Sequence, residues 1–123
     1  MASTLGRPMV IEGGPRAHSR TEIMDMTTFE WSDGPTQTIH QSGGYWGEMA
    51  IIQRDEDLFY LAGGILQHGG LQTAIGKYEG GIWTKIGDLL SARLNPGLVF
   101  NGANQLLAIG GWNPNESLSI LNR

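Results

Sequence analysis

A unit made of an apolar, strand-like run followed by two adjacent glycines recurs three times, and this repeat limits the possible folds more than any other feature. The units end at Gly13-Gly14, Gly63-Gly64 and Gly110-Gly111. Gly13 to Gly63 spans 50 residues, and Gly63 to Gly110 spans 47. A period near 50 residues is typical of β-propeller repeats, whereas helical repeats are shorter.

Other features recur at similar offsets from the glycine pairs. Trp31 follows the first pair by 17 residues, and Trp83 follows the second by 19. The strand-like segments 22–26 and 119–123 also follow their glycine pairs at matching distances. We therefore expect the two tryptophans to be equivalent, and the two segments to be the same strand of successive repeats.

Each repeat is predicted to contain four short antiparallel strands. The first two strands of the last repeat, 97–100 and 105–109, flank Asn101-Gly102, and Asn-Gly between apolar runs favours a hairpin because both residues tolerate positive φ. The central repeat has turn signals at 54–57 and 79–81 and a loop at 65–71. Its predicted strands are 49–52, 58–62, 72–78 and 82–86.

A single four-stranded sheet cannot bury both of its faces, whereas sheets packed radially cover one another. We therefore predict an all-β fragment of a β-propeller, an incomplete ring in which the strand-four tryptophan packs against the adjoining sheet. The expected divisions are an N-terminal tail at 1–8, a partial repeat with strands two to four at 9–44, a complete repeat at 45–90, and a partial repeat with strands one to three at 91–123.

The stretch from Gly76 to Ile86, the corner Ala92-Arg93, the turn Asn101-Gly102 and the final Ile109-Gly110-Gly111 together resemble the kelch repeat. The resemblance covers most of residues 9–123. It implies a propeller that binds another protein, as in adaptors that present substrates to ubiquitin ligases or hold cytoskeletal partners. It also implies a binding rim formed by the loops after the glycine pairs and between the repeats. The rim residues it nominates are Arg16, His18, Gln67, His68, Arg93, Asn95, Trp112 and Asn113.

Composition excludes several other classes of protein. With 123 residues, 40% of them hydrophobic, the chain fits one domain. A net charge of −4 provides no basic surface for nucleic acid, and no apolar run suggests a signal peptide or a membrane span. The absence of cysteine rules out disulfides and thiolate metal sites, and we expect a cytoplasmic protein.

The polar motifs have structural explanations. His18, His40 and His68 lack the short spacing of zinc ligands, although His18 and His68 could contact a partner from the rim rather than being ordinary solvated loop residues. Asp55-Glu56-Asp57 is expected at a hairpin tip, since it lacks the pattern of a calcium loop. The segment 70–78 has the wrong spacing for a phosphate loop, and Asn115 begins a glycosylation sequon that we attribute to chance.

The remaining tryptophans, Trp46 and Trp112, lie beside glycines in predicted loops, where they could anchor a partner or pack within the fold. We expect no catalytic residue, cofactor or metal, and a protein-binding role. Two alternatives remain. One is a fragment of a galactose-oxidase-like propeller enzyme, whose copper site would need the cysteine that this chain lacks, and the other is a structural fragment without activity of its own. The partial repeats are also expected to expose edges that favour self-association.

Overall fold

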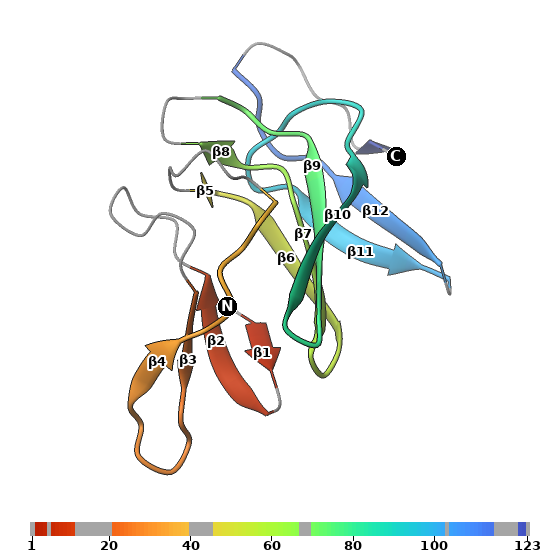
Figure 1. The fold of residues 1–123 in the computed structure, drawn as a ribbon. Helices are drawn as coiled ribbons and strands as arrows, with labels where there is room; N and C mark the ends of the chain where they lie inside the picture. The colour runs from red at the N-terminus through yellow and green to blue at the C-terminus, as the bar shows by residue number, and fades with distance from the viewer. Residues whose placement is uncertain are drawn as a thin grey trace.

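The computed structural model describes residues 2–4, 6–11, 21–39, 46–66, 70–102, 104–114 and 121–122. Within these residues the protein consists of antiparallel strands and contains no helix, which confirms the predicted all-β class. Figure 1 shows three sheets side by side, with the hairpin turns of the first two toward the bottom of the view. We call them the first, central and third sheets in chain order.

The central sheet confirms the predicted four-stranded meander. Its strands are β6 (Ala50–Asp55), β7 (Leu58–Ala62), β9 (Ala74–Glu79) and β10 (Ile82–Asp88), in the order β10-β9-β7-β6. The predicted second strand matches β7 at both ends, because the turn before it and the glycine pair after it leave only this run extended. The third strand begins two residues later than predicted.

The other two sheets follow the same chain order. The first sheet contains β1 (Ala2–Thr4), β2 (Arg7–Ile11), β3 (Thr21–Met24) and β4 (Trp31–Asp33), each paired with the next. The third contains β11 (Gly97–Asn101), β12 (Gln105–Ile109) and β13 (Leu121–Asn122). The arrangement of the sheets is open.

Two expectations about local structure are wrong. Residues 1–8 are not simply a tail, because Ala2–Thr4 form β1 and Arg7 and Pro8 begin β2, so the first sheet has all four strands. Gly6 adopts a φ of 73° in the turn, and this allows the short polar run to fold back. The expected loop at 65–71 contains β8 (Ile65–Leu66), which pairs with β5 (Trp46–Gly47) in a two-stranded ribbon.

The first sheet packs face to face on the central sheet. Met9 and Ile23 of the first sheet join a cluster with Phe59, Tyr78 and Trp83 of the central sheet. Phe59 stacks on Tyr78 with ring centroids 4.7 Å apart, and the Trp83 ring meets both of these rings edge-on, at 5.7 and 5.1 Å. This cluster contains more buried residues than the one on the opposite face of the central sheet. Its aromatic side chains bury a large apolar area per residue.

The segment that leaves the first sheet also ties the two sheets together. The carbonyl of Pro35 accepts hydrogen bonds from the Thr21 hydroxyl (2.8 Å) and from the Trp83 indole N–H (3.1 Å). Thr21 belongs to the first sheet and Trp83 to the central one. One backbone oxygen therefore satisfies a buried donor from each sheet, which fixes how they lie against each other.

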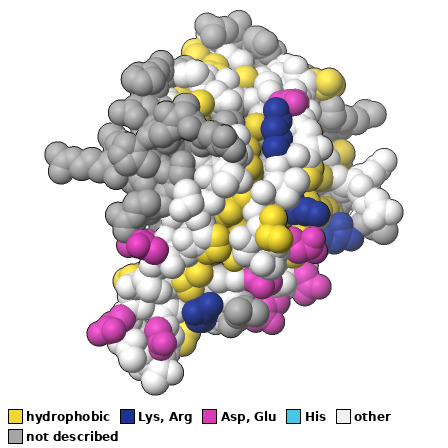
Figure 2. Space-filling view, in the orientation of Figure 1, with side chains coloured by type: hydrophobic (Ala, Val, Ile, Leu, Met, Phe, Trp, Pro, Cys, Tyr) yellow, Lys and Arg dark blue, Asp and Glu magenta, His cyan; other side chains and the backbone are white. Residues whose placement is uncertain are grey.

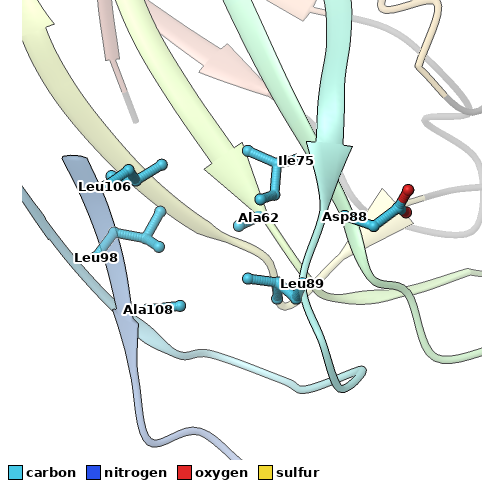
Figure 3. A pocket seen from close by; sticks show the side chains of 7 residues that line it. All are labelled: Ala62, Ile75, Asp88, Leu89, Leu98, Leu106 and Ala108. Carbon is cyan, nitrogen blue, oxygen red and sulfur yellow. The ribbon is translucent and has the colours of Figure 1, made fainter. Parts of the chain in front are cut away.

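The opposite face of the central sheet packs on the third sheet. Ala62 and Ile75 face Leu98 and Ala108 around a cavity of about 30 Å³ that Leu89 and Leu106 also line. Figure 3 shows these apolar side chains converging from both sheets, while the carboxylate of Asp88 points away. The Tyr60 and Phe100 rings meet edge-on at 5.6 Å, and the Arg54 guanidinium lies 4.8 Å from the Phe100 ring centroid. The central sheet is therefore covered on both faces.

Candidate partner-binding rim

The stacked sheets have two different ends. The hairpin end carries the tight turns and many of the acidic residues, and Figure 2 shows acidic side chains around the lower part of one face, beside a band of hydrophobic ones. The other end carries the glycine pairs and the segments that join the sheets. We call this end the connector rim, and define it by residues 63–64, 91–96 and 110–113.

The two described glycine pairs adopt the same backbone conformation. Gly63 and Gly64 have φ values of 75° and 93°, and Gly110 and Gly111 have 65° and 94°. Backbone in this left-handed region favours glycine. Gly80 and Gly81, in the turn between β9 (Ala74–Glu79) and β10 (Ile82–Asp88), have similar values of 58° and 89°, so this conformation is not particular to the repeat. Gly13-Gly14 lie outside the described residues.

The connection from the central to the third sheet runs against both glycine pairs. The Gly64 N–H donates to the Arg93 carbonyl (2.9 Å), and a side chain at Gly63 would place its Cβ 2.4 Å from that same oxygen. A Cβ at Gly111 would lie 2.8 Å from the Leu94 carbonyl. Glycine is required here because another backbone segment occupies the space of a side chain.

Arg93 is part of this packing and is not an exposed binding residue. Its side chain is buried, and the guanidinium Nη1 donates to the Gly110 carbonyl (2.8 Å) and Nε to the Ser91 carbonyl (3.4 Å). Asn113 is also buried, with its amide donating to the Ala92 carbonyl (2.8 Å). Both side chains hold rim loops together, so the partner-contact role expected for them gives way to a structural one.

Trp112 and Asn95 are the nominated residues that the structure places at the surface. The backbone of Trp112 forms two hydrogen bonds with Leu94, of 3.0 and 2.8 Å, yet 62% of Trp112 is exposed. Asn95 is exposed with a φ of 46°, and its N–H donates to the Glu48 carbonyl (2.8 Å). The loops of Arg16, His18, Gln67 and His68 lie outside the described residues.

The recurring tryptophans lie in equivalent strands but in different environments. Trp83 is directly opposite Tyr78 and is buried, while Trp31 is directly opposite Met24 and is 44% exposed. Trp83 faces the first sheet, whereas Trp31 lies on the face of the first sheet that no other described sheet covers. For Trp46 the structure describes the backbone, in β5.

The β3–β4 hairpin displays apolar side chains that sequence analysis did not nominate. Met26 and Phe29 are 50% and 65% exposed, and Phe29 has a φ of 60°. The Phe29 N–H donates to the Asp25 carbonyl (2.7 Å), which sets the shape of this turn. Positive φ at phenylalanine has no signal in a single sequence, because it depends on the closure of the whole hairpin.

Asp25 gives this hairpin a pH dependence. Its carboxylate accepts hydrogen bonds from the backbone N–H groups of Thr28 (3.0 Å) and Thr27 (2.7 Å), and these bonds hold the pKa of Asp25 below its ordinary value. Because the pKa is lower in the folded state, the carboxylate stabilises the fold above the unfolded-state pKa. That stabilisation is lost as the pH falls through the folded-state pKa.

We therefore predict that acid weakens the parent protein more than the variant Asp25→Asn. The amide oxygen of asparagine can still accept one of these bonds but does not titrate. Urea unfolding from pH 7 down to about pH 2.5 should show that the stability difference between the two proteins shrinks below about pH 4. Between pH 6 and 8 the difference should be constant, and a constant difference at every pH would contradict the assignment.

No group of three or more histidine, cysteine, aspartate or glutamate side chains in the described part of the chain is arranged to hold a metal ion. Among the same residues, no helix is long and apolar enough to cross a membrane. The described part of the connector rim therefore consists of a buried network of backbone and polar side-chain hydrogen bonds, together with the exposed side chain of Trp112. Protein-binding surfaces combine apolar side chains with hydrogen-bonding groups, and both are present here on a backbone that hydrogen bonds hold in place.

A comparison with models of known protein families finds no match for this chain, and neither does a comparison with curated protein sequences.

Proposed function

We propose that this chain is a kelch-type repeat unit that binds another protein through its connector rim, with Trp112 as the main contact. The repeat of glycine pairs near 50 residues supports the kelch-type assignment, as does the face-to-face stacking of antiparallel sheets in chain order. The exposed side chain of Trp112 at the connector rim supports the binding role.

The exposure of Trp112 on a fixed backbone is the observation that carries the proposal. The residue is 62% exposed, while both of its backbone polar groups are bonded to the buried residue Leu94. On either side of Leu94 the buried Arg93 and the bonded backbone of Asn95 hold the connection in place. A large aromatic side chain on an ordered backbone loses little conformational entropy on binding, and tryptophan is enriched among the residues that dominate binding energy.

The expected partner is a protein that offers an apolar pocket for the indole, with polar groups around it. Interface contacts of this kind have an apolar centre and a hydrated polar rim. Asn95 is exposed beside Leu94 and provides amide donors and acceptors for such surrounding contacts. The amide groups of this residue would contribute mainly to specificity, because hydrogen bonds exchanged with water add little net affinity.

The test is a binding screen with the parent protein, followed by titration of a captured partner against Trp112→Ala. Loss of a dominant aromatic contact costs about 2 kcal/mol or more, so we expect the affinity to fall by roughly 30-fold or more. Thermal unfolding of the variant should match that of the parent, because the side chain is mostly exposed.

The matched control is Ile82→Ala. Ile82 is 68% exposed, like Trp112, but lies beside the Gly80-Gly81 turn at the hairpin end. Its replacement should leave the affinity unchanged. The rim assignment would be wrong if Trp112→Ala bound every partner as tightly as the parent, and a parent that captures no partner would favour a structural fragment.

A further inference from the structure

Each sheet has two faces that play different roles, and in the central sheet both are packed against a neighbouring sheet. Its leading face, defined by Phe59, Leu61, Tyr78 and Trp83, packs on the preceding sheet. Its trailing face, defined by Ala62 and Ile75, packs on the following sheet. Neighbouring residues of a strand point to opposite faces, so Leu61 and Ala62 divide between the two.

The strand registers extend this division to the other sheets. Trp31 is directly opposite Met24 as Trp83 is opposite Tyr78, so Trp31 and Met24 mark the leading face of the first sheet. Met9 and Ile23, which point the other way, form its trailing face and cover the leading face of the central sheet. In the third sheet, Leu106 and Ala108 lie toward the trailing face of the central sheet and are therefore on a leading face.

The two junctions within the chain thus have the same polarity. At each one, the trailing face of one sheet meets the leading face of the next sheet. Two faces remain uncovered by the sheets that the structure describes. One is the leading face of the first sheet, where Trp31 is 44% exposed. The other is the trailing face of the third sheet, where Val99 is 42% exposed and lies opposite Leu107.

We propose that a second copy of this chain covers these faces, with the trailing face of one third sheet stacked on the leading face of another first sheet. The open faces are of the two kinds that already pack on each other twice within the chain, so this contact would continue an existing series of junctions. Its two sides differ, which makes the association head-to-tail. Two copies would bring six sheets together, within the range of about four to eight at which propeller rings close.

The known cost of open apolar sheet faces supports the same conclusion. Apolar area is driven out of water in proportion to its size, and contiguous exposed apolar surface marks interaction sites. The exposed face of the first sheet carries Trp31 and Met24 with the pair Glu22 and Asp33 beside them, and the exposed face of the third sheet carries Val99 and Leu107. This contact lies on the sheet faces and not on the connector rim. Stacking between copies can therefore prove wrong while rim binding holds, and rim binding can prove wrong while stacking holds.

The experiment is sedimentation of the 123-residue protein with one lysine substitution on each face, Trp31→Lys or Val99→Lys. The parent should sediment with a mass that rises with concentration toward two chains or more. A lysine on either face would lose its hydration in the contact, so each variant should associate at least roughly 100-fold more weakly. Both positions are partly exposed in the single chain, and circular dichroism should confirm that the variants remain folded.

Mixing the two variants provides the decisive test. Trp31→Lys retains an intact third sheet and Val99→Lys retains an intact first sheet, so a one-to-one mixture should form dimers and nothing larger. The control Ile82→Lys, at a 68% exposed position of the central sheet, should associate like the parent. A monomeric parent at all concentrations would overturn the proposal. So would a mixture that stays monomeric, or association that only one of the two variants abolishes.

Discussion

Replacing Trp83 by alanine should lower the free energy of unfolding by about 3–5 kcal/mol, the usual cost of removing a buried tryptophan. The Trp83 side chain contacts Phe59 and Tyr78 edge-on and donates a hydrogen bond to the Pro35 carbonyl. The substitution would therefore leave a cavity between the first and central sheets and remove one of the two donors to Pro35. Urea unfolding followed by far-ultraviolet circular dichroism measures the change.

Trp31→Ala is the matched control, because Trp31 occupies the equivalent strand position of the first sheet and is 44% exposed. At concentrations too low for the chains to associate, it should cost less than about 1 kcal/mol, as is usual for surface substitutions that leave no cavity. Where Trp83→Ala does not fold, Trp83→Phe serves as the milder variant, since it retains an aromatic ring and loses the indole donor. Its expected cost is about 1–2 kcal/mol. Equal costs at positions 31 and 83 would contradict the packing described above.

Gly63→Ala should be the second large effect, at about 3–4 kcal/mol. A positive φ costs a residue with a side chain about 1–2 kcal/mol, and overpacking adds about 1–3 kcal/mol. The new Cβ would lie 2.4 Å from the Arg93 carbonyl oxygen, and this oxygen cannot move freely because it also accepts the Gly64 N–H bond. Chemical denaturation provides the measurement.

Gly110→Ala isolates the steric part of this effect. Gly110 has nearly the same φ, 65° against 75°, but an added Cβ there would have no atom within 4 Å. We expect a cost of about 1 kcal/mol, from the backbone conformation alone. If the two alanine variants were equally stable, the close approach of the connecting segment to Gly63 would not exist in solution.

Much of the local structure could be predicted because it depends on neighbouring residues. The strands 58–62 and 105–109 are bounded by turn-forming residues on one side and a glycine pair on the other, and the structure has them at those limits. The strand at Ala2–Thr4 was not predictable in this way. It is short and polar, and it becomes a strand through pairing with Arg7–Ile11 and through the contacts of buried Thr4 with Asp57 and Tyr78.

The candidate site was less predictable than the strands. The repeat nominates the connecting segment 91–96 and Trp112, but it does not separate the residues that hold these loops together from those that are exposed. Arg93 and Asn113 are polar residues in a predicted loop, and such residues are usually exposed. They are buried here because backbone carbonyls of neighbouring loops, those of Gly110 and Ala92, meet their donors.

The amino-acid sequence alone specifies the short strands, their turns and the positions that favour glycine. These features depend on the φ preferences of single residues and on the alternation of apolar and polar residues along a short segment. The packing of one sheet on another determines which of the side chains are buried. Trp31 and Trp83 share the same sequence features, yet one is 44% exposed and the other 7%, because burial depends on whether another sheet lies against that face. Contacts between residues far apart in the chain have no local signal, and so only the assembled fold reveals them.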